Sequence, residues 1–142
     1  MEELKQEGQI KISEEIDIVT VRKAVRQLSS QVGFSQTDVT RIVTAASELA
    51  RNIYHYAGHG VMKWRLVSEN NDTGIELIFE DSGPGIEDIE KAMDMGYTTG
   101  GGLGMGLPGA KRLMDRLNIQ SEPGKGTTVT ISKWLQGSMH AM

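Results

Sequence analysis

The sequence predicts an α+β fold: a two-layer sandwich in which a mixed, mostly antiparallel sheet carries its helices on one face. Three segments have apolar residues at helical spacing, and other segments alternate apolar and polar residues as half-buried strands do. Their order is strand, helix, helix, two strands, glycine-rich loop, helix and two strands. A chain of 142 residues suits one core, so we expect one domain over residues 8–135 and a disordered tail at residues 136–142.

The first predicted strand and the first predicted helix are adjacent in the chain. Ile10 and Ile12 alternate with polar neighbours, which predicts a short strand. We expect Asp17 to cap the helix that follows and Gly33 to end it, because glycine readily adopts the left-handed conformation found after helices. This helix has apolar residues at every third or fourth position: Ile18, Val21, Val25, Leu28 and Val32.

The second helix is predicted to begin at Ser35, with Asp38 three residues later forming a capping box, and to end at Gly58. Its apolar face is broad: Val39, Ile42, Val43, Ala46, Leu49, Ala50 and Ile53.

After this helix, apolar residues recur at every second position instead of every third or fourth. Apolar residues at positions 62, 64, 66, 75, 77 and 79 flank a polar turn at residues 70–74, which predicts a β-hairpin.

The last third of the chain predicts one long helix and two strands. A short helix is expected over residues 88–93, and a glycine-rich run follows it. The long helix begins within residues 104–108, where Pro108 is tolerated because first-turn amides have no helical partner. Its expected buried stripe is Leu107, Ala110, Leu113, Met114 and Leu117. Residues 119–121 and 127–135 predict the closing strands, joined by a Pro-Gly turn.

Composition excludes several classes of protein. A net charge of −4 argues against a nucleic-acid binder, which would need a basic surface. The absence of cysteine excludes disulfides and thiolate metal sites, and it is compatible with a reducing cytoplasm. Residues 1–9 are acidic and polar, unlike a secretory leader, and no apolar run approaches the ~20 residues of a membrane span. We therefore expect a cytoplasmic protein that binds neither nucleic acid nor membrane.

Glu48 and Asn52 are the first pair of candidate site residues. They lie four positions apart, so on a helix their side chains emerge on one face, opposite the apolar stripe. A carboxylate beside a carboxamide suits oxygen coordination of Mg²⁺ and proton abstraction next to it. Two solvated polar residues would look the same. Arg51 lies three positions after Glu48 and is expected to form an ion pair with it.

Asp81, Gly83 and Gly85 form the second candidate group, at the end of a predicted strand. A carboxylate at the mouth of a cleft can accept a hydrogen bond from the exocyclic amine of adenine, whereas the carbonyl oxygen of guanine would be repelled there. The pattern is also compatible with an ordinary turn, in which glycine supplies unusual backbone angles.

The third group is the glycine run that enters the last predicted helix. Glycines let backbone N–H groups approach phosphates, and the start of a helix carries a partial positive charge. No lysine or arginine occurs between Lys91 and Lys111, so amides and a metal ion would have to neutralise a bound triphosphate. A flexible hinge is the alternative interpretation. The expected phosphate-binding residues are Gly102, Leu103, Gly104, Met105 and Gly106.

The order of these motifs resembles that of the GHKL superfamily of ATPases and kinases, which has the Bergerat fold. Glu48-x-x-x-Asn52, Asp81-x-Gly83-x-Gly85, the glycine run and Gly126-Thr127 correspond to its N, G1, G2 and terminal boxes. The resemblance covers roughly residues 8–135. It implies a fold that binds ATP together with Mg²⁺.

Longer stretches resemble the RsbT-like serine/threonine kinases of bacterial stressosomes, relatives of the anti-sigma factor kinases. These stretches are residues 47–54, 80–86, 101–109 and 133–135. The resemblance implies that Glu48 is the catalytic base toward a substrate hydroxyl and that Asn52 holds Mg²⁺. It also implies that Asp81 recognises adenine, that Gly85 shapes the floor of the pocket, and that Thr127 joins the adenine-side hydrogen bonds through water.

The same resemblance implies partners. The substrates would be STAS-domain antagonist and scaffold proteins, RsbS-like and RsbR-like, phosphorylated on serine or threonine. After release, the kinase would activate an RsbU-like PP2C phosphatase in a partner-switching stress response. The alternative function is a non-catalytic, nucleotide-gated module that sequesters a partner as an anti-sigma factor does. Glu48 favours the kinase, because sequestration needs no base.

Overall fold

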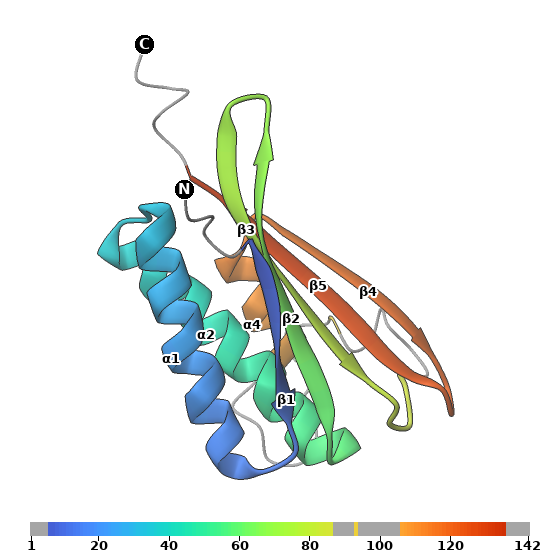
Figure 1. The fold of residues 1–142 in the computed structure, drawn as a ribbon. Coiled ribbons are helices and arrows are strands. Elements are labelled where there is room, and N and C mark those ends of the chain that lie inside the picture. Colours follow the sequence, from blue (N-terminus) through green and yellow to red (C-terminus); the bar gives the residue numbers. More distant parts are fainter. Residues whose placement is uncertain (1–5, 87–92, 94–105, 136–142) are drawn as a thin grey trace.

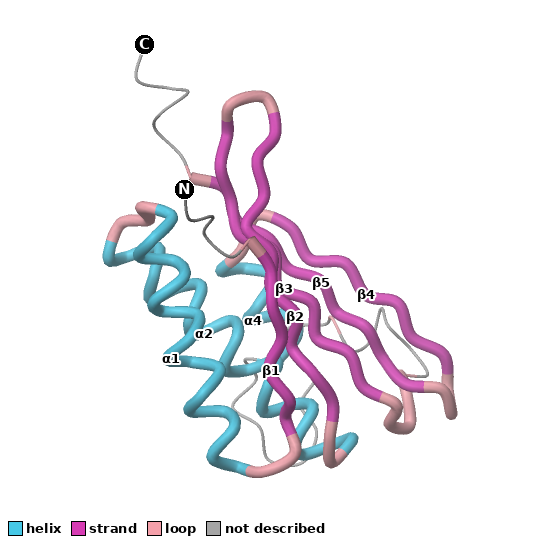
Figure 2. Tube along the Cα trace, in the orientation of Figure 1, coloured by secondary structure: helices cyan, strands magenta, loops and turns pink. Residues whose placement is uncertain are grey.

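The computed structural model describes residues 6–86, 93 and 106–135, which form two layers. Helices α1 (Glu15–Val32), α2 (Gln36–Asn52) and α4 (Gly106–Leu113) lie on one face of a twisted sheet (Figure 1). No described helix covers the other face (Figure 2). The predicted two-layer α+β fold is confirmed. The expected short helix at residues 88–93 and the expected tail at residues 136–142 lie outside the described residues, residue 93 excepted.

The sheet has five strands within the described residues, in the order β1-β2-β3-β5-β4. All pairings between them are antiparallel, so the parallel pairing that a mixed sheet implies is not found among the described strands. Asn70 and Asn71 form the tip of the predicted hairpin with φ of 52° and 71°, left-handed angles that asparagine tolerates. The strand bounds are β1 (Glu7–Ile12), β2 (Gly60–Glu69), β3 (Asp72–Asp81), β4 (Arg116–Glu122) and β5 (Gly126–Trp134).

The start of α1 corrects one prediction. The helix begins at Glu15, so Asp17 lies inside its first turn instead of capping it from outside. The carboxylate reaches back and accepts hydrogen bonds from the backbone amides of Ser13 (2.8 Å) and Glu14 (2.9 Å). These hydrogen bonds, from Ser13 first and Glu14 second, lower the pKa of Asp17 below its ordinary value. At the other end Gly33, with φ of 109°, ends the helix as predicted.

The second helix begins as predicted and ends in an unforeseen way. The Ser35 hydroxyl accepts a hydrogen bond from the amide of Asp38 (3.1 Å), but the Asp38 carboxylate pairs with Arg41 instead of completing a capping box. The α-helix stops at Asn52, and a π-helix, η1 (Ile53–Ala57), continues the chain to Gly58. Short π-helical segments are frequent at functional sites, and this one starts directly after a candidate site residue.

The core lies between the two layers. Val25 of α1, Ile42 and Leu49 of α2, and Leu77 and Phe79 of β3 are almost completely buried there. Burial of these side chains, about 1.5–3 kcal/mol each, holds the helices on the sheet. Within the same interior the Ser29 hydroxyl of α1 is fully buried, and it has no hydrogen-bond partner among the described residues.

The last helix is shorter than predicted. It ends at Leu113, and Leu117, expected in its buried stripe, belongs to β4 instead. Lys133 of β5 is only 8% exposed, and its Nζ donates a hydrogen bond to the Leu113 carbonyl (3.0 Å) and lies 3.8 Å from Oδ1 of Asp115. The buried ammonium therefore ties the end of α4 to the sheet. Periodicity alone could not reveal the break, because Leu113 and Leu117 keep helical spacing across it.

Candidate functional site

Four residues line up across one end of the sheet. Asp81, the last residue of β3, pairs in register with Gly60 of β2 and with Thr127 of β5, and Thr127 pairs with Ser121 of β4. All four lie on the helix-covered face. Side chains along a strand point to the two faces in turn, and each of the four is an even number of residues from a position that faces the helices, as Asp81 is from the buried Phe79. Two predicted site residues, Asp81 and Thr127, are thus direct neighbours.

The end of α2 and the first turn of η1 approach this row through Gly60. An added Cβ at Gly60 would lie 2.8 Å from Cγ2 of Ile53 and 3.2 Å from Cβ of Asp81. Gly60 therefore lets η1 pack directly against the strand end that carries Asp81. Sequence reasoning did not single out Gly60, because its role depends on a neighbouring strand and a neighbouring helix at once.

Asp81 anchors the turn that follows it. Its Oδ1 accepts a hydrogen bond from the backbone amide of Gly83 (2.9 Å), and its Oδ2 has no hydrogen-bond partner among the described residues. A side chain at Gly83 would collide with Ala57 of η1, whose Cβ lies 2.6 Å from the position of an added Cβ. The turn is thus held between β3 and η1.

Gly85 fits the same turn against the β4–β5 hairpin. Its φ is +78°, and an added Cβ would overlap the carbonyl oxygen of Glu122. The amide of Gly124 donates a hydrogen bond to the Pro84 carbonyl (2.7 Å) at the same contact. Gly85 is therefore required both for its backbone angle and for the close approach of the two segments.

Ser121 is a site residue that sequence reasoning missed. Its hydroxyl accepts a hydrogen bond from the amide of Ile86 (2.8 Å), lies 3.0 Å from the Gly126 carbonyl and lies 2.8 Å from the hydroxyl of Thr127. One side chain thus joins the turn after Asp81 to the start of β5. The alternation of β4 placed Ser121 on the inner face, but its partners follow only from the strand register.

The expected ion pair between Glu48 and Arg51 is confirmed on α2. Nη1 of Arg51 lies 3.2 Å from Oε1 of Glu48, and 24% of the Glu48 side chain is exposed. Asn52 is the last residue of α2, one turn beyond Glu48. An added Cβ at Gly106, the first residue of α4, would lie 3.9 Å from Nδ2 of Asn52. The structure therefore brings Asn52 to the start of α4, while Gly102, Leu103, Gly104 and Met105 lie outside the described residues.

The chemistry of these groups suits a nucleoside triphosphate bound together with Mg²⁺. The described residues contain no group of three or more histidine and carboxylate side chains that would hold a metal ion by themselves. Mg²⁺ in phosphoryl-transfer sites is bound mainly by phosphate oxygens and water, with one or two protein ligands, so a lone carboxamide such as Asn52 fits it. The start of α4 adds amides and partial positive charge for phosphate.

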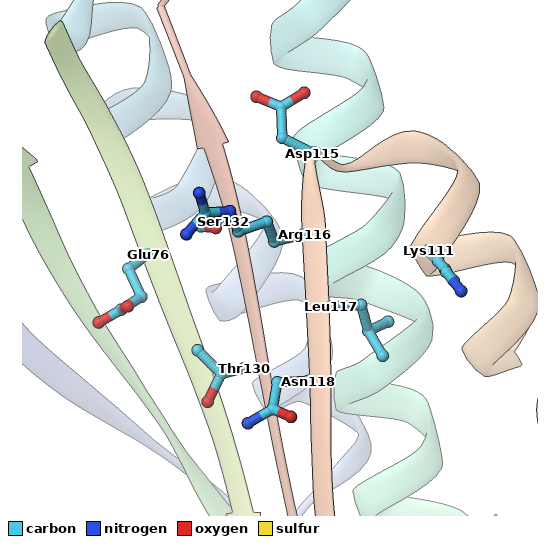
Figure 3. Close-up of a pocket in the computed structure, with 8 residues that line it drawn as sticks. All are labelled: Glu76, Lys111, Asp115, Arg116, Leu117, Asn118, Thr130 and Ser132. Carbon is cyan, nitrogen blue, oxygen red and sulfur yellow. The ribbon is translucent and has the colours of Figure 1, made fainter.

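A hollow of about 470 Å³ lies elsewhere on the molecule (Figure 3). It lies on the helix-free face and around the edge strand β4, where Glu76, Arg116, Thr130 and Ser132 line it. Because Thr130 and Ser132 point away from the buried face of β5, this hollow is separate from the row that contains Asp81 and Thr127. We do not assign it to the nucleotide site.

The described residues contain no helix long and apolar enough to cross a membrane.

Comparison with known proteins gives one consistent family. Residues 13–133 match the histidine kinase-like ATPase domain family. The chain is 48% identical over 127 residues to the serine/threonine-protein kinase RsbT of Bacillus subtilis, covering 89% of this chain and 96% of that protein. It is 36% identical over 120 residues to an anti-sigma F factor of a Thermoanaerobacter species, covering 80% and 82%.

A solved structure has the same fold. The crystal structure of the RsbU and RsbW domains of a Mycobacterium tuberculosis protein matches with a TM-score of 0.59 and 20% identity, covering 91% of this chain and 32% of that chain. At that identity the match shows the fold alone. Taken with the sequence matches, it places the chain in the family of histidine kinase-like ATPase domains, as an ATP-dependent protein kinase of the RsbT-like group.

Proposed function

We propose that this protein transfers the γ-phosphoryl group of ATP to a serine or threonine of STAS-domain partners, RsbS-like antagonists and RsbR-like scaffolds. In this proposal it acts in the cytoplasm in a bacterial stress-signalling switch, and after release it activates an RsbU-like PP2C phosphatase. The observation that supports a nucleotide site is that Asn52 lies at the start of α4, while Ile53, the next residue, packs through Gly60 against Asp81, the strand neighbour of Thr127. The partners rest on similarity to RsbT.

Asp81 and Thr127 would bind the adenine. Oδ2 of Asp81, which has no hydrogen-bond partner among the described residues, would accept a hydrogen bond from the exocyclic amine, and Thr127 lies directly across the strand pair from it. Gly83 and Gly85 support this side of the pocket by letting the turn pack against η1 and the β4–β5 hairpin. Adenine is favoured over guanine because guanine would direct a carbonyl oxygen at a carboxylate.

The phosphates would lie at the start of α4. Gly106 and the residues before it, Gly102, Leu103, Gly104 and Met105, would supply backbone amides, and Asn52 would supply a ligand to Mg²⁺. When bound, Mg²⁺ neutralises phosphate charge during transfer. Positioning and charge neutralisation account for most of the rate in phosphoryl transfer, so this sparse set of groups is sufficient.

Glu48 would act as the general base. Arg51 holds Oε1 of the carboxylate, which leaves Oε2 to accept a proton. As the oxygen of the partner's hydroxyl bonds to the γ-phosphorus, its proton passes to Glu48, the bond to the bridging oxygen breaks, and ADP leaves. Glu48 lies one helical turn from Asn52, about 6 Å along the axis, a spacing that suits groups acting on the same terminal phosphate.

The test is phosphate transfer from radiolabelled ATP, with Mg²⁺, to a purified STAS-domain protein. We expect acid-stable phosphoserine or phosphothreonine with the wild type. Glu48→Ala should bind ATP normally and lose transfer by about 10²–10⁴-fold, the usual contribution of a general base. Arg41→Ala is a matched control that removes a similar exposed ion pair on the same helix. Normal transfer by Glu48→Ala would contradict its role, and acid-labile label would indicate phosphohistidine instead.

A nucleotide-gated sequestration module is the second candidate. Similarity to anti-sigma F factors over 80% of the chain favours it. In that case the wild type and Glu48→Ala would bind the partner equally well with ATP present, and neither would transfer label to it.

A further inference from the structure

The Ser121 hydroxyl is the centre of a small hydrogen-bond network beside the adenine side of the site. Its partners are the amide of Ile86, the carbonyl of Gly126 and the hydroxyl of Thr127, at 2.8, 3.0 and 2.8 Å. They come from two segments: Ile86 lies in the turn after Asp81, and Gly126 and Thr127 are the first two residues of β5, of which Thr127 pairs in register with Asp81. Through this network Ser121, a residue of β4, connects the turn after Asp81 to the start of β5.

The number of hydrogens fixes the direction of each bond. A serine hydroxyl has one hydrogen and two lone pairs. The Ile86 amide is a donor, so it occupies one lone pair of the Ser121 oxygen. The Gly126 carbonyl has no hydrogen to donate, so the Ser121 hydrogen must point to it. The remaining lone pair accepts the hydrogen of the Thr127 hydroxyl. If Ser121 donated to Thr127 instead, the Ser121 oxygen and the Gly126 carbonyl oxygen would lie 3.0 Å apart with no hydrogen between them.

We infer that Ser121 is a positioning residue that sets nucleotide specificity by holding the Thr127 hydroxyl with its hydrogen turned away from the ligand. Thr127 then presents only acceptor lone pairs beside Asp81. The inference rests on the proposed function, because it requires that the base of the nucleotide binds at Asp81 and Thr127.

Two acceptors side by side favour a base with an amino group over a base with a carbonyl oxygen at the same ring position. Adenine carries an amino group with two hydrogens, so it can donate to Asp81 and Thr127 directly. Hypoxanthine carries a carbonyl oxygen at the same ring position, and this oxygen would face acceptors only. If Ser121 is removed, the Thr127 hydroxyl is free to rotate and donate, so the penalty against hypoxanthine falls.

The experiment compares the dissociation constants of ATP and ITP, with Mg²⁺, for the full chain and its variants. We expect Ser121→Ala to reduce the ATP preference about fivefold, the worth of one neutral hydrogen bond. Ser132→Ala, a serine on the helix-free face of β5 with no hydrogen bond from its hydroxyl to a described residue, is the matched control and should keep the wild-type ratio. If Ser121→Ala does not fold, Ser121→Cys takes its place with the same expected result.

A double-mutant cycle with Thr127→Val separates a direct role from a positioning role. Because Ser121 acts through Thr127, the double variant should have the same ATP-to-ITP ratio as Thr127→Val alone. Additive losses would overturn the inference, and so would an unchanged ratio in Ser121→Ala. If the wild type and Asp81→Asn both bind ATP and ITP equally, the adenine assignment itself fails and the inference fails with it.

Discussion

Gly85 should be much harder to replace than Gly124, which provides a matched comparison. Their φ values are +78° and +80°, so alanine at either position has the same left-handed backbone cost, about 1–2 kcal/mol. At Gly124 an added Cβ meets nothing within 4 Å, whereas at Gly85 it overlaps the carbonyl oxygen of Glu122 and lies 3.1 Å from Cα of Pro123. Both obstacles are backbone or ring-constrained atoms, so no side-chain rotation relieves them.

The extra cost at Gly85 follows from what must move. Separating the turn from the hairpin breaks the hydrogen bond from Gly124 to Pro84, about 1 kcal/mol, and overpacking adds about 1–3 kcal/mol. We therefore expect Gly85→Ala to lower the free energy of unfolding by about 2–4 kcal/mol more than Gly124→Ala. In a domain of this size that corresponds to a melting temperature about 10 °C lower.

Urea denaturation and thermal melting of the two variants measure this difference, and titration with ATP measures the site. Gly85→Ala should also lose most of its ATP affinity, because the turn that carries Asp81 is displaced, while Gly124→Ala should keep it. Equal destabilisation of the two variants would refute the close contact between the turn and the hairpin.

Three further predictions concern stability. Ser29→Ala should raise the free energy of unfolding by about 1 kcal/mol in urea, because it removes a buried hydroxyl that has no partner among the described residues; a less stable variant would reveal a bond to that hydroxyl. Lys133→Met should lower it by about 2 kcal/mol, since the Leu113 carbonyl loses its buried donor and Asp115 loses its ion-pair partner; an unchanged urea midpoint would show that the ammonium does not hold α4. The lowered pKa of Asp17 means that its stabilising effect is complete above the unfolded pKa, near 4, and is lost as the pH falls through the folded value. Asp17→Asn should therefore be less stable than the wild type at pH 7 and approach it at pH 2–3, and a gap independent of pH would contradict the role of the charge.

Local sequence signals predicted most of the secondary structure, because they depend on neighbouring residues. Gly33 ends α1, and Ser35 starts α2, because each position is decided by the conformation and hydrogen bonds of one turn. The prediction failed for Asp17. Aspartate is a common N-cap residue, but Glu14 is the N-cap of α1, and Asp17 lies in the first turn, where its carboxylate accepts a hydrogen bond from the amide of Glu14. The break after Leu113 was missed because helical spacing continues into β4.

For the site, the sequence by itself determined which chemical groups are present and in what order: a carboxylate and carboxamide one turn apart, an aspartate followed by glycines, and a threonine after the last glycine. Only the tertiary structure decided their partners. The pairing of Asp81 with Thr127, the role of Ser121 and the need for glycine at position 60 depend on strand register and on η1 packing against β3. Such contacts join residues far apart in the chain, and no local periodicity encodes the distance between them.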